Sequence, residues 1–102
     1  MDHEQQCPHC QREKARNEEE VRRLIHRLNR IEGQIRGIRG MVERNAYCTD
    51  ILTQSAAVNA AVNAFNKDLL ASHIRTCVAQ DIRQGNDEVV DELVVTLQKL
   101  MK

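Results

Sequence analysis

The fold is decided by residues 48–77, which read CTDILTQSAAVNAAVNAFNKDLLASHIRTC. This segment contains neither proline nor glycine, and its larger hydrophobic residues recur at helical steps of three, four or seven. The residues that follow these steps are Ile51, Val58, Val62, Phe65 and Leu69. The pattern predicts one unbroken helix that begins near Thr49 or Asp50 and ends just before Gly85.

Three side chains of the kind that bind soft metals lie on this predicted helix: Cys48, His73 and Cys77. His73 and Cys77 are four positions apart, so their side chains share one face, a turn apart. Cys48 falls on nearly the same face, but about 37 Å away along the axis at roughly 1.5 Å per residue. Because metal–sulfur and metal–nitrogen bonds are only about 2.0–2.3 Å long, one straight helix cannot bring all three to one ion.

Two copies of the helix could form the site if they packed antiparallel. Cys48 of one subunit would then lie beside His73 and Cys77 of the other, with a two-fold axis near Ala61 and Val62. Several alanines there would permit close approach, and two equivalent sites per dimer would follow. The alternative is that both cysteines are small buried hydrophobic residues and His73 is a hydrogen-bonded core histidine.

Length and composition suit a small helical bundle. The chain has 102 residues, one proline and few aromatics, so we expect one domain that would bury an adequate core more easily as an oligomer. It contains no apolar run long enough to span a membrane and no signal peptide. We therefore expect a cytoplasmic protein whose four cysteines bind metal or undergo redox chemistry rather than form disulfides.

Residues 1–16 show no hydrophobic period, which predicts a flexible tail ahead of a single domain over residues 17–102. The tail contains Cys7, His9 and Cys10, which could form an accessory metal-binding group. A structural zinc site usually has four ligands in two separated pairs. An ordinary tail without a metal role is therefore the other interpretation.

Two further helices are predicted on either side of the central one. The first spans roughly residues 18–44, between a capping Asn17 and Asn45. Seven of its aliphatic residues are spaced alternately by three and four positions and form a stripe for a partner helix. They are Val21, Leu24, Leu28, Ile31, Ile35, Ile38 and Val42. The last helix follows Asn86 or Asp87 and carries Glu92, which either faces solvent or reaches His73 and fixes its tautomer.

The net charge of zero conceals an excess of arginine in residues 21–44, which hold seven arginines against two glutamates. A face selected only for solubility would mix lysine and glutamate. Arginine in excess favours phosphate contacts with double-stranded nucleic acid, although a solvated charged face remains the alternative. The candidate DNA contacts are Arg16, Arg23, Arg27, Arg30 and Arg75.

Three glycines lie opposite the aliphatic stripe of the first helix: Gly33, Gly37 and Gly40. Each costs about 0.8–1.0 kcal/mol relative to alanine in a helix interior. Either another backbone or a phosphate chain comes close there, or the glycines are simply tolerated.

These residues leave two classes of function open. One is a metal-responsive nucleic-acid binder, and the other is a metal carrier or redox protein whose arginines only solubilise it. An enzyme is disfavoured, because the sequence offers no nucleophile–base–acid set and no phosphate loop.

Two blocks of sequence resemble the copper-sensitive operon repressor family. The first is RLNRIEGQIRGI at residues 27–38, and the second combines YCTDIL at 47–52 with HIRTCV at 73–78. The resemblance covers about residues 20–101. It implies an all-α, three-helix protomer that forms an antiparallel-bundle dimer and then a tetramer. It also implies that the metal-free form binds operator DNA and that Cu(I) causes release and derepression of copper-efflux genes.

The resemblance also assigns the site. Cys48, His73 and Cys77 match the copper-sensing ligands, while Tyr47 and Glu92 match a pair of residues that supports them. Aligning Glu92 requires a one-residue difference in the preceding loop. Two thiolates and one imidazole suit Cu(I), whereas zinc would seek a fourth ligand. A repressor of the same family that senses zinc or another thiol-reactive inducer is the alternative.

Overall fold

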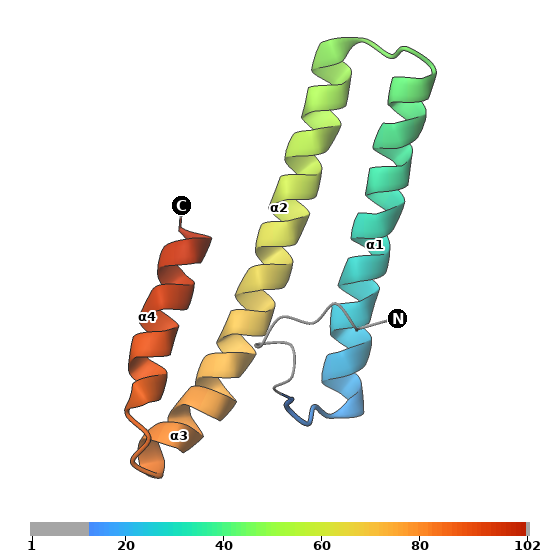
Figure 1. Cartoon of the computed structure of the whole chain (residues 1–102). Coiled ribbons are helices and arrows are strands. Elements are labelled where there is room, and N and C mark those ends of the chain that lie inside the picture. The colour runs from blue at the N-terminus through green and yellow to red at the C-terminus, as the bar shows by residue number, and fades with distance from the viewer. Residues whose placement is uncertain (1–12, 102) are drawn as a thin grey trace.

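The path of the chain is an antiparallel hairpin of two long helices, followed by a shorter third helix. A computed structural model describes residues 13–101. The elements are α1 (Glu18–Glu43), α2 (Cys48–His73), the π-helical turn η2 (Ile74–Val78), α3 (Ala79–Arg83) and α4 (Glu88–Leu100). α2, η2 and α3 follow one another as a single rod, and α4 runs back from its lower end (Figure 1). The predicted all-α, three-helix protomer is confirmed.

α1 has the bounds that its sequence predicts, to within a residue. The Asn17 side chain accepts a hydrogen bond of 2.7 Å from the backbone N–H of Glu20, and three glutamates occupy the first turn. These acids face the positive end of the helix dipole. The helix ends at Glu43, and Asn45 takes a left-handed conformation with φ of 59°.

The rod is continuous, but it is not α-helical throughout. It begins at Cys48, so Thr49 and Asp50 lie inside its first turn. The backbone keeps right-handed helical dihedrals through Ile74 and Ala79, yet residues 74–78 form a π turn that the hydrophobic periodicity does not predict. The rod then ends at Arg83, and Gly85, with φ of 86°, reverses the chain toward α4.

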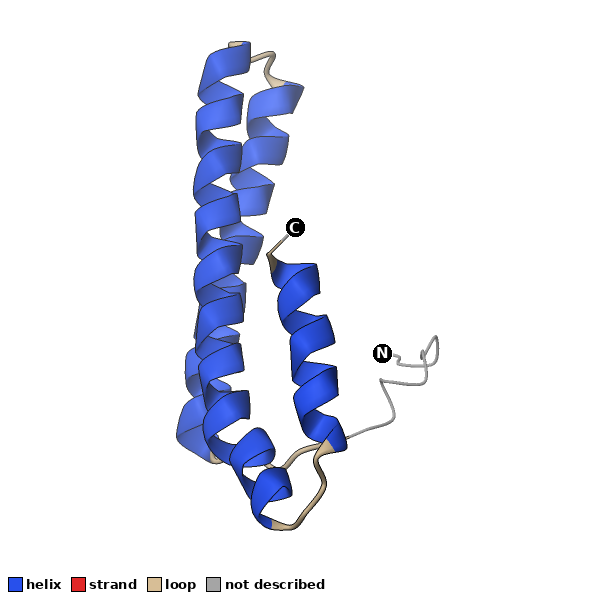
Figure 2. Ribbon diagram, turned by 90° about the vertical axis from the view of Figure 1, so that its left-hand side faces the viewer, coloured by secondary structure: helices blue, strands red, loops and turns tan. Residues whose placement is uncertain are grey.

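α1 packs along α2, whereas α4 contacts the rod at η2 and α3. Figure 2 shows the resulting shape: the long hairpin stands on one side, and α4 rises beside it from the lower end. The protomer is elongated, measuring 56 × 28 × 27 Å. Within residues 13–101, no helix combines the length and the apolar character needed to cross a membrane.

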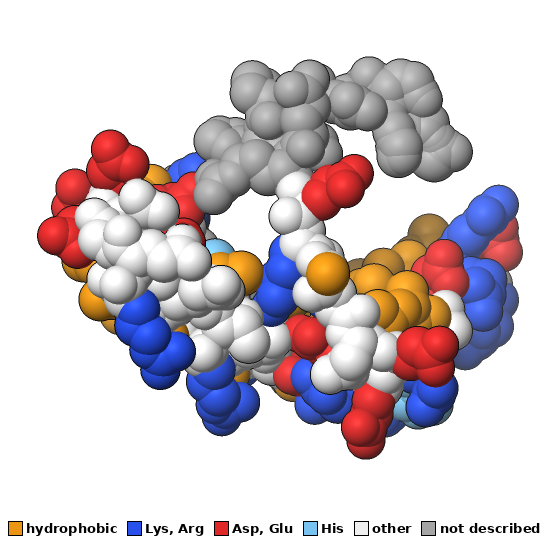
Figure 3. All heavy atoms as spheres, turned by 90° about the horizontal axis from the view of Figure 1, so that it is seen from below, with side chains coloured by type: hydrophobic (Ala, Val, Ile, Leu, Met, Phe, Trp, Pro, Cys, Tyr) orange, Lys and Arg blue, Asp and Glu red, His pale blue; other side chains and the backbone are white. Residues whose placement is uncertain are grey.

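The hydrophobic core of one protomer is small. Among the described residues only four apolar side chains are buried: Leu24, Ile31, Val78 and Val89. The aliphatic stripe of α1 is divided, because its Leu28, Ile35 and Val42 are 40–57% exposed, and α2 has no buried residue at all. Hydrophobic side chains also reach the surface seen from below (Figure 3). Apolar exposure of this extent is typical of a subunit that packs against others.

Candidate metal centre

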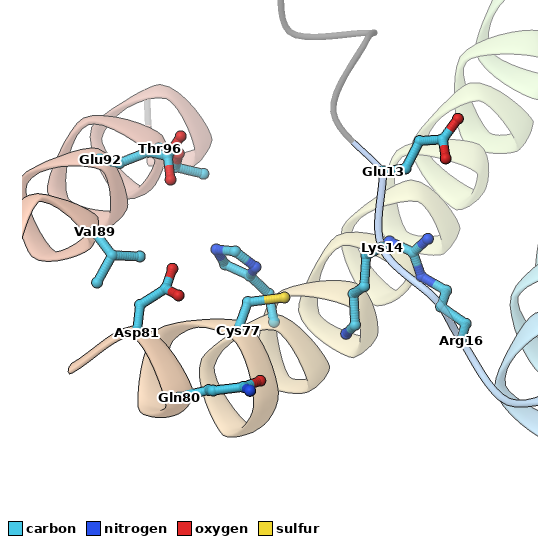
Figure 4. Close-up of a pocket in the computed structure, with 10 residues that line it drawn as sticks. Glu13, Lys14, Arg16, Cys77, Gln80, Asp81, Val89, Glu92 and Thr96 are labelled. Carbon is cyan, nitrogen blue, oxygen red and sulfur yellow. The ribbon is translucent and has the colours of Figure 1, made fainter. Parts of the chain in front are cut away.

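A cavity of about 710 Å³ lies where the π turn, α4 and the segment 13–16 meet. His73 and Cys77 line it from the rod, and both are partly buried. Glu92 and Thr96 line it from α4, opposite Cys77 and Asp81 (Figure 4). The structure therefore brings two of the three predicted metal ligands, His73 and Cys77, to one cavity.

The π turn begins directly after His73 and contains Cys77, the other predicted ligand in this cavity. His73 is the last residue of α2, and Cys77 belongs to η2. A π turn widens the helix and changes the angle between side chains four positions apart, and such turns occur frequently at functional sites. The Thr76 hydroxyl donates a 2.7 Å hydrogen bond to the Ser72 carbonyl, a contact that favours bending of a helix. The local backbone thus sets how the imidazole and the thiol face each other.

A polar network holds the segment 13–16 against this part of the rod. Lys14 Nζ donates to Thr76 Oγ1 at 2.7 Å and to Ser72 Oγ at 3.4 Å. Ser72 Oγ donates to the Glu20 carboxylate at 2.5 Å, and Glu20 is the one buried charged residue in the described part of the chain. Lys14, in the last part of the predicted tail, is therefore bonded to Ser72 and Thr76, the residues directly before His73 and Cys77.

Cys48 lies at the opposite end of the rod from this cavity. It is exposed in the first turn of α2, and Tyr47, the residue before it, is 73% exposed. The 26 residues of α2 cover about 39 Å at roughly 1.5 Å per residue. Within residues 13–101, no group of three or more histidine, cysteine or acidic side chains could hold a metal ion. One protomer thus places two of the predicted ligands at one end of the rod and the third at the other.

The two predicted supporting residues are separated in the same way. Glu92 shares the cavity with His73 and Cys77, whereas Tyr47 accompanies Cys48. The shared cavity fits the expected contact between Glu92 and His73, which stays a prediction. The accessory group predicted at Cys7, His9 and Cys10 lies outside the described residues.

Two of the arginines predicted to contact DNA are paired with a carboxylate of α2. Arg23 donates from Nε and Nη2 to the two oxygens of Asp68, each at 2.8 Å, and Arg27 Nε donates to Asp68 at 3.1 Å. The hydrogen bond from Arg23 is the main reason why the pKa of Asp68 lies below its ordinary value. The same bond raises the pKa of Arg23. Sequence reasoning missed Asp68, although it is the single acidic residue between positions 51 and 80.

The other predicted arginines have different surroundings. Arg16 lines the cavity that contains His73 and Cys77. Arg30 lies over the alanine-rich face of α2, beside Ala57 and Ala61. Arg75 is exposed on the π turn and does not line the ligand cavity. Contact of these five arginines with DNA stays a prediction.

Comparison with known proteins identifies the family. Residues 20–99 match the sequence model of the metal-sensitive transcriptional repressors. The chain belongs to this family. It is 42% identical over 88 residues to the copper-sensing transcriptional repressor CsoR of Bacillus subtilis (strain 168). The aligned residues cover 85% of this chain and 87% of the relative. It is also 44% identical over 59 residues to the copper-sensing repressor RicR of Mycobacterium tuberculosis, covering 58% of this chain and 62% of RicR.

Two solved structures have a similar fold. The copper-sensing repressor CsoR with Cu(I) from Geobacillus thermodenitrificans NG80-2 superposes with a TM-score of 0.83 at 42% identity, covering 88% of this chain and 95% of that one. The nickel-responsive regulator InrS superposes with a TM-score of 0.70 at 32% identity, covering 85% and 99%. Since one fold accommodates sensors of different metals, the inducer has to be inferred from the ligands.

Proposed function

We propose that this protein is a Cu(I)-responsive transcriptional repressor. Its metal-free form binds operator DNA, and Cu(I) bound by Cys48, His73 and Cys77 releases the DNA and derepresses copper-efflux genes. The observation that carries the proposal is the placement of His73 and Cys77 in one cavity, with Cys48 at the far end of a continuous rod. Relatives at 42–44% identity are named copper-sensing repressors, which supports it.

The donor set favours Cu(I) over other metals. Two thiolates and one imidazole are soft ligands, and three of them satisfy Cu(I). Zinc prefers four ligands in a tetrahedral arrangement, so it would need a further donor. Glu92 and Asp81 line the same cavity, and their carboxylates are better suited to orienting His73 than to binding a soft ion.

A complete site requires a second subunit. An antiparallel partner would place its own Cys48 at the cavity of the first protomer and would cover apolar surface that one protomer leaves exposed. The small residues of α2, including Ala57, Ala60, Ala61 and Ala64, allow two such helices to approach closely. Association of two dimers into a tetramer is the further step that we propose from the family resemblance.

The signal would pass from the ligands to the arginines through the hairpin. When bound, Cu(I) supplies short bonds that join the start of one rod to the π turn of the other. His73 ends α2, so a change in its position would shift α2 against α1, which carries Arg23, Arg27 and Arg30. Loss of a few phosphate contacts is enough to supply a coupling free energy of about 1–3 kcal/mol.

The test is a titration of the protein bound to an operator duplex, which can be isolated by selection from random DNA. We expect salt-dependent binding by the metal-free protein and dissociation as about one Cu(I) per protomer is added. Equal amounts of Zn(II), Ni(II) or an oxidant should leave the complex intact. A protein that binds Cu(I) but shows no affinity for any duplex would instead be a metal carrier, and dissociation by Zn(II) would identify a zinc sensor.

A further inference from the structure

Asp68 joins the helix that carries His73 to the helix that carries the arginines. Its two oxygens accept hydrogen bonds across the hairpin from Arg23, which is 45 residues away in sequence, and from Arg27, which is 41 residues away. We propose that Asp68 is an internal competitor of the DNA phosphates for Arg23 and Arg27, so that it favours release of DNA. The inference rests on the proposed function, because it assigns a regulatory role within the same switch.

The geometry of the pair is the geometry that arginine uses for phosphate. Arg23 presents two parallel N–H groups to two oxygens of Asp68, each at 2.8 Å. Arginine recognises phosphate with the same fork, so Asp68 occupies one binding edge of Arg23. Its negative charge also cancels one of the two positive charges of the cluster, which weakens the attraction of both arginines for DNA.

The depth of the three side chains places the carboxylate beneath the guanidinium groups. The Asp68 side chain is 17% exposed, whereas those of Arg23 and Arg27 are 46% and 39% exposed. A phosphate approaching from solvent therefore meets the arginines first. To bind it fully, both side chains have to turn away from α2, and Asp68 opposes that movement.

The position of Asp68 in the rod connects this competition to the metal ligands. Asp68 lies five residues before His73 on α2, without a break in the helix between them. A displacement of α2 that starts at His73 would therefore also move Asp68 relative to Arg23 and Arg27 on α1. The released form would keep the interhelical pairs, and the DNA-bound form would exchange them for phosphate contacts.

The experiment compares Asp68→Asn with a matched control, Glu43→Gln. Both substitutions remove one negative charge and keep the side-chain shape, but Glu43 pairs with Arg39 at 3.2 Å on the same helix, where both groups are exposed. Operator affinity is measured with and without Cu(I) for wild type and both variants. The ratio of the two affinities, typically 5–150-fold in coupled systems, is the readout.

We expect Asp68→Asn to tighten DNA binding, most of all in the copper-loaded form, and to reduce the ratio by about tenfold. Glu43→Gln should change both affinities slightly and equally, leaving the ratio as in wild type. Cu(I) affinity in the absence of DNA, measured by chelator competition, should match wild type in both variants. Asp68→Glu keeps the carboxylate and should retain the wild-type ratio. If Asp68→Asn fails to fold, Asp68→Ser also removes the negative charge and should reduce the ratio in the same way.

Two results would overturn the inference while leaving the proposed function in place. One is an unchanged ratio in Asp68→Asn with normal release of wild type by Cu(I). The other is weaker DNA binding by Asp68→Asn in both forms, which would mean that Asp68 orients the arginines for DNA. A wild-type protein that stays on DNA in the presence of Cu(I) would overturn the proposed function and this inference together.

Discussion

His73 is the proposed metal ligand that ends α2, and it lines the cavity together with Cys77. In a His73→Ala variant the thiols of Cys48 and Cys77 remain, so we expect Cu(I) still to bind. Release of DNA should be impaired, since no imidazole connects the ion to the end of α2. Operator affinity measured with and without Cu(I) would check this.

The control for that variant is His26→Ala. His26 is exposed on α1 and does not line the ligand cavity, so its removal should leave copper-induced release as in wild type. Release by His73→Ala at wild-type copper concentrations would show that the histidine does not transmit the signal.

Asp68 should also give the hairpin a specific acid sensitivity. Its hydrogen bond from Arg23 lowers the pKa in the folded protein below the ordinary value of 3.8. A lowered folded pKa means that the pairing stabilises the fold above the ordinary value and that this contribution is lost as the pH falls through the folded pKa. Wild type should therefore lose more stability than Asp68→Asn between pH 7 and about pH 3. Urea unfolding at both pH values measures the difference, and parallel losses would contradict the expectation.

At this scale the sequence predicted the chemical identities but not every contact. Cys77 and His73 were assigned to one face from their spacing, and the shared cavity agrees with that assignment. Helical periodicity could not predict the pairing of Arg23 with Asp68, because it relates residues three or four positions apart on one helix. The partner lies 45 positions away, and only the register of the antiparallel hairpin brings it close.

At the scale of elements, capping residues predicted where the helices begin and end. The change from α-helical to π-helical hydrogen bonding inside the rod was not predicted. Asn17 and Gly85 mark the ends of α1 and of the rod because their caps and dihedral angles have specific side-chain requirements. The π turn has no such requirement. The backbone N–H groups of the same residues can donate to the carbonyl four or five positions earlier. Which carbonyl they choose depends on packing around Thr76 and Val78, which the sequence of this segment alone does not determine.

Gly37 offers a test of why α1 contains three glycines. A β-carbon added there would meet no atom within 4 Å in the protomer. Gly37→Ala should therefore stabilise the protein by about 0.5–1 kcal/mol, because alanine loses less backbone entropy in a helix. Urea unfolding would measure the gain.

Gly85→Ala is the opposing control, since the left-handed φ of 86° should make alanine destabilising there. If Gly37→Ala instead lost stability, a neighbouring subunit would pack closely against that face. If it gained stability but lost affinity for DNA, the phosphate backbone would approach it, and the glycine would serve recognition.

For the whole molecule, the sequence predicted the fold class because helical periodicity is a local property. It did not predict how thin the core of one protomer would be. Stripe residues such as Leu24 and Leu28 look equivalent in sequence, yet the first is buried and the second is 40% exposed. Which apolar residues a second subunit covers depends on the arrangement of two chains, and periodicity within one chain does not specify it.

The proposed intersubunit site makes a prediction that a site within one subunit cannot share. Neither Cys48→Ala nor Cys77→Ala alone should bind Cu(I) tightly, because each homodimer lacks one thiol in both sites. A heterodimer of the two variants should regain one complete site, since the intact Cys48 of one chain would meet the intact His73 and Cys77 of the other. Equal mixing of unfolded chains followed by refolding should restore about one quarter of a tight site per protomer, for random pairing of chains in a two-fold dimer.

Chelator competition during the Cu(I) titration would measure the restored sites. The control is each variant refolded alone, which should show none. If the mixture also showed none while forming dimers, the three ligands could not be shared across the interface in the way that the straight rod requires. The proposed mechanism, in which Cu(I) joins the start of one subunit's rod to the π turn of its partner, would then be wrong.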